Sequence, residues 1–354
     1  MRLHLSKLLV GLLLSSILLA GCASTGSTQP AATQAPAVST KAPQAEVTPQ
    51  LTKVKVSVLP FLTYAPLFIA KEEGFYAEQG LDVEFVPIEK NSDAMAPLAQ
   101  GQLDVASGSF DVSTLNAIAK GAKIRYVSDK GYLDPNACSA MTFVVRKELF
   151  ESGALKDPAK LKGMKVALMA ASSSEYALDL MLKNTGLTTK DLDVQNLPFP
   201  TRLEAMNNGS LDITAVSDPW TIRFAKSGSS AVWEGMEQVL PNIQFSVNIY
   251  GPNFLEKNPE LGKKYMIAYL KGVRQYNLGK TDRNVEILAK YTQMKPEEVK
   301  QSCWISMKAD GMIDKGSLSG FQEWALARGF LVSLIPPEQL LDMSFVQYAN
   351  DAIK

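Results

Sequence analysis

Residues 54–86, VKVSVLPFLTYAPLFIAKEEGFYAEQGLDVEFV, decide the fold of this chain. Apolar and polar residues alternate at both ends of the stretch, and this alternation predicts two strands. The middle has apolar residues at helical spacing, and Pro66 suits the first turn of a helix. The stretch therefore predicts a strand–helix–strand unit.

Residues 164–220 repeat this unit. Each copy opens with a lysine and a short β-rich run, at Lys55 and at Lys165. Each then has a loop rich in small or hydroxyl residues, a helix, a strand, a second helix that ends in glycine, and an LDV or LDI strand. Strands that alternate with helices in this way predict βαβ units on a largely parallel sheet. Two copies predict an α/β fold with two similar lobes.

The rest of the body completes this layout. The segment FSVNIYGPNF predicts one more strand and a loop, and from about Pro259 the apolar spacing turns helical. We assign residues 53–143 and 242–354 to lobe one and residues 144–241 to lobe two. The two crossings between the lobes would form a hinge.

The first residues predict targeting rather than fold. Arg2 and Lys7 precede an apolar run that is too short to span a membrane, and the run ends in Leu19-Ala20-Gly21-Cys22, which resembles the bacterial lipobox. We expect residues 1–21 to be a lipoprotein signal peptide and Cys22 to be acylated, with palmitate as one acyl group. A secreted protein with a chance cysteine is the alternative.

Residues 22–52 are expected to form a disordered tether, because Ala, Thr, Pro, Ser and Gln dominate and large apolar side chains are scarce. The sequence thus predicts a protein anchored by lipid at the extracytoplasmic face of a cell membrane.

Composition narrows the chemistry. Of the 36 basic and 36 acidic residues, only Arg2 and Lys7 lie in the signal segment, so the mature chain has no basic excess that would suggest nucleic acid. The only histidine also lies there, and no Cys-x-x-Cys motif is present, so we expect no metal site, no cofactor and no catalytic residue. Cys138 and Cys303 either pair or remain two separate buried thiols.

The phrases PLFIAKEEGFYAEQGLDVEFV, LAQGQLDVASGS, LKGMKVAL and NGSLDITAVSDPW resemble, in this order, the solute-binding proteins of ABC importers for nitrate, sulfonates, taurine and thiamine-pyrimidine precursors. The resemblance covers nearly all of the mature body. It implies a two-lobed periplasmic-binding-protein fold, a small-molecule ligand held in the cleft between the lobes, and delivery to an ABC permease and its ATPase. We expect such a protein to be a monomer.

Ligands of open α/β sheets bind beyond the carboxyl ends of the strands. This rule, together with the family's cleft segments, selects loops at Pro60–Tyr64, Ser107–Asp111, Ala171–Glu175 and Ser217–Trp220, with a fifth near Asn91. The predicted ligand-binding residues are Phe61, Tyr64, Asn91, Ser107, Ser109, Phe110, Ser172, Ser173, Ser174, Tyr176, Asp218 and Trp220.

Several of these residues have an equally simple structural role. Phe61 and Phe110 also fit the core, and Ser172 also fits a helix cap. Asp218 also fits a turn before Pro219, and Trp220 also fits packing within its lobe.

The four main loops offer aromatic faces, hydroxyls and carboxylates, and contain neither Lys nor Arg. This composition favours a neutral or cationic heterocycle with NH or OH groups, such as a vitamin. Riboflavin is the first hypothesis. A thiamine pyrimidine precursor and a sulfonate- or nitrate-type anion are the alternatives within the family.

Two other classes of protein stay open. A related fold makes the thiamine pyrimidine with a histidine that the mature chain lacks, so an enzyme is not expected. A sensory receptor is the remaining rival.

Overall fold

The structure is a computed structural model, and it describes residues 50–353. The predicted signal peptide, the predicted acylated Cys22 and nearly all of the predicted tether lie outside this range.

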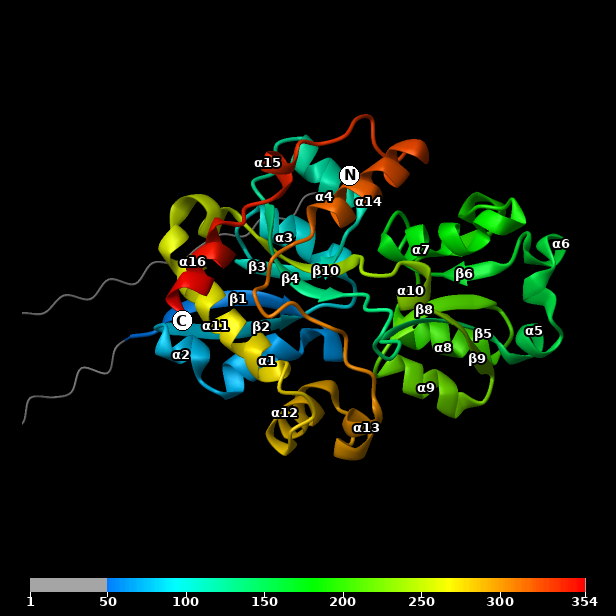
Figure 1. Ribbon diagram of the computed structural model, residues 1–354, viewed down its shortest axis with the longest axis horizontal. Coiled ribbons are helices and arrows are strands. Elements are labelled where there is room, and N and C mark those ends of the chain that lie inside the picture. The colour runs from blue at the N-terminus through cyan, green and yellow to red at the C-terminus, as the bar shows by residue number, and fades with distance from the viewer. Residues whose placement is uncertain (1–49, 354) are drawn as a thin grey trace, which may run out of the picture. The chain divides into compact units, whose positions relative to one another are not determined.

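The first sheet has five strands in the order β2-β1-β3-β10-β4. β1 lies parallel to both β2 and β3, whereas β10 runs antiparallel to β3 and to β4. β10 thus returns from the far part of the chain and is inserted between two strands of the N-terminal part (Figure 1). The strands are β1 (Thr52–Val58), β2 (Leu81–Pro87), β3 (Val105–Ser109), β4 (Arg125–Tyr132) and β10 (Gln244–Tyr250).

The second sheet repeats this arrangement with the order β7-β6-β8-β5-β9. β6 lies parallel to β7 and β8, and the one antiparallel strand is β5, which lies between β8 and β9. Its strands are β5 (Met141–Arg146), β6 (Lys165–Ala167), β7 (Asp193–Gln195), β8 (Ile213–Ser217) and β9 (Ser230–Gly235). The predicted α/β class with two mostly parallel sheets is confirmed. We call the first sheet with its helices lobe one, and the second with its helices lobe two.

In both copies of the repeat, an aspartate and the backbone of a lysine join two strands by the same pair of hydrogen bonds. The carboxylate of Asp104 accepts a hydrogen bond from the backbone N–H of Lys55 at 2.7 Å, and the N–H of Asp104 donates to the carbonyl of Lys55 at 2.9 Å. Asp212 and Lys165 make the same pair of bonds, both at 2.9 Å. The LD phrase of each repeat therefore joins two neighbouring strands.

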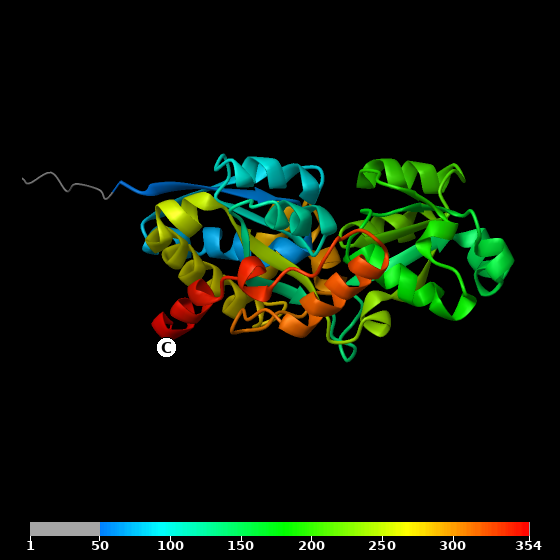
Figure 2. The same cartoon turned by 90° about the horizontal axis from the view of Figure 1, so that it is seen from above.

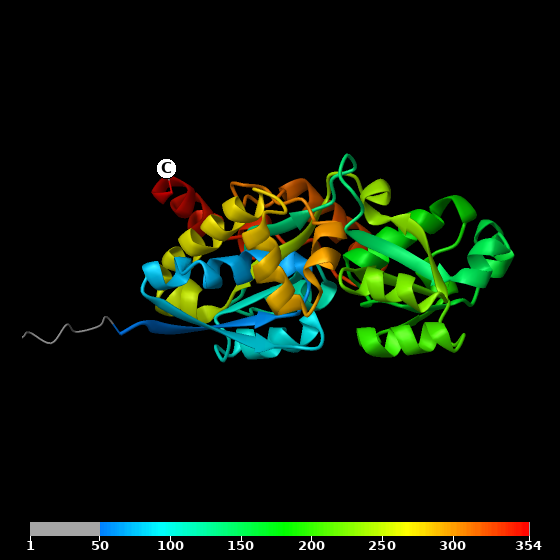
Figure 3. The same ribbon diagram turned by 90° about the horizontal axis from the view of Figure 1, so that it is seen from below.

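Helices from both ends of the chain cover the first sheet. α1 packs against α11, and α11 packs against α16 (Figure 3). A Cβ at Gly272 of α11 would lie 2.3 Å from the carbonyl oxygen of Pro66, so glycine permits the close crossing of α11 over α1. These helices are α1 (Ala65–Glu72), α2 (Phe75–Glu78), α3 (Met95–Ala99), α4 (Val112–Ala119), α11 (Pro259–Tyr276), α12 (Asp282–Thr292), α13 (Pro296–Gln301), α14 (Lys315–Ala327), α15 (Pro337–Leu340) and α16 (Ser344–Ala352).

The helices of the second lobe come from one continuous part of the chain. They are α5 (Lys147–Glu151), α6 (Pro158–Leu161), α7 (Ser173–Leu182), α8 (Phe199–Asn207), α9 (Trp220–Ser227) and α10 (Met236–Val239). α7 also contacts α14 of lobe one (Figure 2). There the buried Arg328 pairs with the carboxylates of Glu175 and Asp179.

Short helical turns connect the larger elements. Two of them prove important for the site: η1 (Leu62–Tyr64) follows β1, and η2 (Asn91–Ala94) follows β2. The others are η3 (Ala154–Lys156), η4 (Lys183–Thr185), η5 (Thr189–Asp191) and the π-helical turn η6 (Asn253–Lys257).

The chain crosses between the sheets twice, from β4 to β5 and from α10 to β10. These crossings lie where the sequence predicts a hinge. β5 begins at Met141, and the residue-level boundaries of the lobes stay a prediction.

Candidate functional site

A cleft lies between the two lobes, at the carboxyl ends of the parallel strands. The loops that follow β1 and β2 and the end of β3 line it from one side, and the loops that follow β6 and β7 and the end of β8 line it from the other. It holds about 850 Å³ of empty space, part of which is open to solvent.

Its walls are mostly apolar and come from both lobes. Lobe one contributes Leu59, Phe61, Thr63, Tyr64, Glu89, Lys90, Asn91, Ser109, Lys130, Phe245 and Ser246. Lobe two contributes Met141, Leu168, Met169, Ser174, Asn196, Leu197, Pro198, Phe199, Arg202, Ala215, Val216 and Ser217.

Five of the predicted ligand-binding residues line this cleft: Phe61, Tyr64, Asn91, Ser109 and Ser174. Phe61 meets the lobe-two ring of Phe199 edge to face, with centroids 5.0 Å apart. The hydroxyl of Tyr64 lies 2.9 Å from Asn91 Oδ1 and 3.0 Å from the carbonyl oxygen of Ser107. The turns after β1 and β2 therefore meet strand β3 in one hydrogen-bonded corner.

The structure places five other predicted residues behind the walls. Ser107 is fully buried and bonds to Asn248, and Phe110 packs in the core against Tyr126 and Phe321. Ser172 is the N-cap of α7, Ser173 donates to the carbonyl of Phe110, and Tyr176 packs against Trp324. The core and cap roles considered for Phe110 and Ser172 are the ones observed.

Asp218 and Trp220 also lie outside the cleft walls. Asp218 is buried, burial raises the pKa of its carboxyl, and its Oδ1 has no hydrogen-bond partner within residues 50–353. Trp220 stacks on Phe199, with centroids 5.6 Å apart, and so supports a cleft wall from behind. Contact of these two side chains with a ligand stays a prediction.

Lys130 is a site residue that sequence reasoning missed. It lies on β4, its side chain is only 1% exposed, and it ends in the cleft. Its ammonium donates to the carbonyl oxygen of Thr63 at 3.1 Å and sits 3.8 Å from the centre of the Tyr64 ring. Among the described residues no carboxylate pairs with it, and burial lowers the pKa of Lys130 to about 7.

Arg202 is the second missed cation, and it comes from α8 in the other lobe. Its Nε donates to the carbonyl of Leu197 at 2.7 Å, and its Nη1 donates to the carbonyl of Ala215 at 3.1 Å. It is 5% exposed, and within the described part of the chain it too has no acidic partner. Burial lowers the pKa of Arg202 to about 10, so it stays charged at neutral pH.

The absence of Lys and Arg from the four loops therefore does not make the cleft free of cations. Both charges come from regular elements, which a search of loops passes over. The loop after β7, residues 196–198, and Phe199 at the start of α8 were also missed, although this loop occupies the position in the second repeat that the Asn91 loop occupies in the first. Applying the repeat consistently would have found it.

The lobes touch along one side of the cleft. The N–H of Val112 donates to the carbonyl of Ala171 at 2.9 Å, and the N–H of Ser173 donates to the carbonyl of Phe110 at 3.0 Å. The N–H of Leu62 lies 3.4 Å from the carbonyl of Asp218. The structure thus has the two lobes in contact across the cleft.

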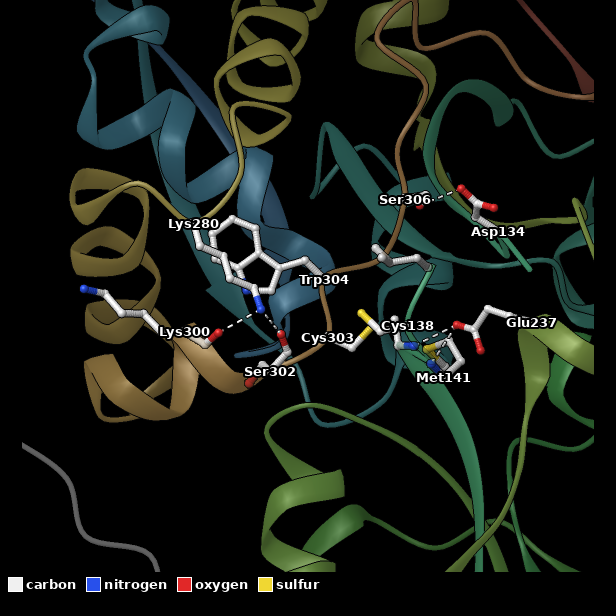
Figure 4. Close-up of a disulfide and its surroundings, with 12 residues drawn as sticks. Asp134, Cys138, Met141, Glu237, Lys280, Lys300, Ser302, Cys303, Trp304 and Ser306 are labelled. Carbon is white, nitrogen blue, oxygen red and sulfur yellow. Dashed lines mark hydrogen bonds between the residues drawn. A yellow bond between two sulfur atoms is a disulfide. The ribbon is translucent and has the colours of Figure 1, made fainter. Parts of the chain in front are cut away.

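A disulfide joins Cys138 to Cys303 beside the first crossing (Figure 4). Cys138 lies in the loop between β4 and β5, and Cys303 lies in the segment after α13. That segment is fixed to lobe one, because Trp304 stacks on Tyr276 and Ser306 pairs with Tyr132. The open question of whether these cysteines pair is settled in favour of pairing.

Within residues 50–353, no helix is long and apolar enough to cross a membrane. The same residues contain no cluster of three or more His, Cys, Asp or Glu side chains arranged to hold a metal ion.

Two five-stranded sheets that share a cleft at their carboxyl ends define the class of two-lobed α/β proteins built like periplasmic binding proteins. Residues 62–277 match the family described as NMT1/THI5 like, and the chain belongs to this family.

Its relatives agree with this assignment. The chain is 28% identical over 282 residues to the nitrate/nitrite binding protein NrtA of Nostoc sp., covering 73% of this chain and 62% of the relative. It is 26% identical over 245 residues to the bicarbonate-binding protein CmpA of Synechococcus elongatus, covering 63% of this chain and 52% of the relative. The chain thus spans between about half and two thirds of the length of these curated relatives.

The fold resembles the crystal structure of the periplasmic nitrate-binding protein NrtA from Synechocystis PCC 6803, with a TM-score of 0.71 and 15% identity. The match covers 86% of this chain and 90% of that one. The predicted two-lobed periplasmic-binding-protein fold is confirmed.

Proposed function

We propose that this chain is the substrate-binding component of an ABC-type importer and that its ligand is an anion. The observation that carries the proposal is the pair of buried cations, Lys130 from lobe one and Arg202 from lobe two, which line one cleft without acidic partners. A buried charge without a counter-ion is costly, and a bound anion would supply the missing partner. Among the described residues that line the walls, the only acidic one is Glu89, in the segment after β2.

The position of the cations explains how binding would favour closure. A ligand closes a hinge only by the contacts that it gains in the closed state. An anion that reaches both Lys130 and Arg202 makes such contacts with both lobes. Family membership and the nitrate- and bicarbonate-binding relatives support the same reading.

A ligand panel tests the proposal. We expect isothermal titration calorimetry with nitrate, bicarbonate and ethanesulfonate to give saturable binding of at least one anion. Arg202→Gln should weaken that binding by about 10- to 150-fold, the value of losing a hydrogen bond to a charged group. The matched control is Lys162→Gln, which removes an exposed cation away from the cleft. Equal losses for both variants would rule out a cleft-bound anion.

Riboflavin is the second candidate, and a specific feature favours it. The cleft presents the aromatic rings of Phe61, Tyr64 and Phe199 together with the amides of Asn91 and Asn196, which suits a flat, neutral heterocycle. Quenching of flavin fluorescence at micromolar protein, unaffected by salt, would favour it over the anion. A thiamine pyrimidine precursor belongs in the same panel as a further neutral ring.

We retain two further parts of the sequence-based hypothesis in the proposal. The protein would deliver its ligand to a membrane permease and ATPase at the extracytoplasmic face, and it would be held there through acylated Cys22. Cys22→Ser should then appear in the soluble fraction or keep its signal segment. Lipid labelling of that variant would contradict the anchor.

A further inference from the structure

Lys130 is an unusual buried charge because of what surrounds it, and the inference drawn from it rests on the proposed anion-binding function. Arg328, the comparable cation near α7, is paired with two carboxylates. Lys130 has instead one carbonyl oxygen, that of Thr63, and the face of one aromatic ring, that of Tyr64. An ammonium has three N–H donors, so this environment leaves donors for a ligand.

The adjacent carboxylate is turned to other partners. Oδ1 of Asp129 accepts a hydrogen bond from the N–H of Gly131 at 2.9 Å, and Oδ2 accepts one from the N–H of Lys308 at 2.9 Å. Gln244 also bonds to Oδ1. Within the described residues Asp129 makes no hydrogen bond or ion pair with Lys130, although its charge partly offsets the effect of burial on the pKa of Lys130.

The ring of Tyr64 is fixed in place by groups from the turn after β2 and from strand β3. Its hydroxyl lies 2.9 Å from Asn91 Oδ1 and 3.0 Å from the carbonyl of Ser107. Asn91 packs closely against Gly108, since a Cβ at residue 108 would lie 3.3 Å from three atoms of Asn91 and would displace that side chain by a few tenths of an ångström. The turn after β2 and strand β3 thus hold the ring at the position where its face meets the ammonium.

We propose that Tyr64 is a positioning residue that replaces the counter-ion of Lys130. An aromatic face attracts a cation but carries no net charge, so it stabilises the ammonium without neutralising it. A carboxylate at this place would compete with the ligand for Lys130. The ring therefore keeps the cation both buried and available, and the anionic group of the ligand completes its shell.

This arrangement makes binding depend on pH. Burial lowers the pKa of Lys130 to about 7, and Asp129 opposes this shift from a distance. The other ionisable side chains on the cleft walls are Glu89, Lys90 and Arg202. A bound anion favours the protonated ammonium, so binding above pH 7 requires uptake of a proton and should weaken as pH rises.

The first test measures Lys130 in the empty protein and needs no ligand. The lysines of the full chain are reductively methylated with ¹³C, and the Lys130 signal, assigned by its loss in Lys130→Gln, is titrated by NMR. Tyr64→Leu should lower the pH at which Lys130 titrates by about half to one and a half units. Tyr64→Phe, which keeps the ring, should move it much less. The same titration in wild type and Tyr64→Leu would overturn the inference.

The second test uses nitrate and ethanesulfonate, whose charges are constant between pH 6 and 9. Wild-type affinity should fall about 10- to 30-fold between pH 6.5 and 8.5, and Lys130→Gln should bind weakly with a flat profile. In Tyr64→Leu the decrease in anion affinity should begin at a lower pH than in wild type. Arg202→Gln should lower the affinity at every pH but leave the pH range over which the affinity decreases unchanged.

The outcomes separate the two claims. If neither of these anions nor bicarbonate binds wild type at any pH, the proposed anion ligand fails, while the NMR titration still decides the role of Tyr64. If an anion binds with a flat pH profile, the proposed function stands and the role of Tyr64 is refuted. If Tyr64→Leu lowers the anion affinity equally at every pH and leaves its pH dependence unchanged, the ring acts only by packing.

Discussion

The two lobes are built to one plan and differ in how each supplies its charge to the cleft. In both, four strands run in parallel, a fifth is inserted in the opposite direction, and an aspartate locks the first and third strands. In lobe one the cation is Lys130, on a strand beside the hinge and against a ring. In lobe two it is Arg202, on a helix, where two backbone carbonyls hold the guanidinium and the ring of Phe199 lies 4.3 Å from it.

This difference shows that the two copies of the repeat share a strand arrangement but supply different charged side chains to the cleft. The guanidinium of Arg202 stays charged at any physiological pH, and its geometry is set by its hydrogen bonds. The ammonium of Lys130 is a point charge whose protonation its surroundings can tune. One lobe thus offers a constant charge and the other an adjustable one.

The largest effect should come from breaking the link that joins the segment after α13 to the first crossing. Lobe two is one continuous stretch, whereas lobe one is made of two distant pieces, and the disulfide spans a sequence separation of 165 residues. Cys138→Ser with Cys303→Ser should cost about 2–5 kcal/mol of unfolding free energy and lower Tm by about 4–15 °C. Calorimetry checks this, and hydrogen exchange shows which lobe loses protection. An unchanged Tm would contradict it.

Lys130→Met should make the empty protein more stable while abolishing anion binding. The pKa of Lys130 is lowered from an ordinary value near 10.5 to about 7, so between these values the unfolded chain holds more protons than the folded chain. Wild-type stability therefore rises with pH across this window. The gain from Lys130→Met should be about 2–4 kcal/mol at pH 6 and vanish by about pH 10.5. Urea unfolding at several pH values measures it, and a gain independent of pH would argue against a buried charge.

Substituting Asp104 and substituting Asp212 should lower the free energy of unfolding by different amounts. Asp212 also pairs with Arg146 at 2.8 Å, whereas Asp104 accepts its second bond from the neutral amide of Asn253 at 2.7 Å. Asp212→Asn leaves a half-buried guanidinium without its main partner and should cost about 1–2 kcal/mol, against about 0.5–1 kcal/mol for Asp104→Asn. Denaturant unfolding compares the two variants. Equal costs would mean that the backbone bond dominates in both lobes.

The smallest effect should come from Gly108→Ala. Strand β8 of lobe two carries Val216 at the equivalent position, so the exchange makes the lobes more alike. The new methyl group would displace Asn91 by a few tenths of an ångström and weaken ligand binding about 2- to 5-fold. In an Asn91→Ala background the same exchange should be neutral, because the effect acts through that side chain. A loss that persists there would point to the strand itself.

The frame of the molecule could be predicted from the sequence because a local pattern determines it. Alternation, helix-ending glycines and the paired LD phrases indicated both sheets and the similarity of the lobes. The insertion of β10 between β3 and β4 depends on contacts between distant segments, and no local pattern reports those.

The site was harder to predict because the local sequence does not show which charged side chains become buried or which loop side chains face the interior. Lys130 lies in the segment SDKGY, whose composition is typical of a solvated turn. In the structure this segment is part of β4, and both Asp129 and Lys130 are buried. Arg202 looks like an ordinary helical arginine, and only the packing of α8 shows that its head is enclosed. Ser107 and Phe110 were selected for their place in a loop, but their side chains face the interior.

The bond between Cys138 and Cys303 also turns most of the body into a covalent ring. All strands of the second lobe, together with β10 and α11–α13, lie between the two cysteines. A protease that cuts the backbone once anywhere in this span leaves a single molecule with both flanking pieces attached. The pieces part only after the sulfur bridge is reduced, so a nicked population would look intact on a non-reducing gel and show itself only under reduction.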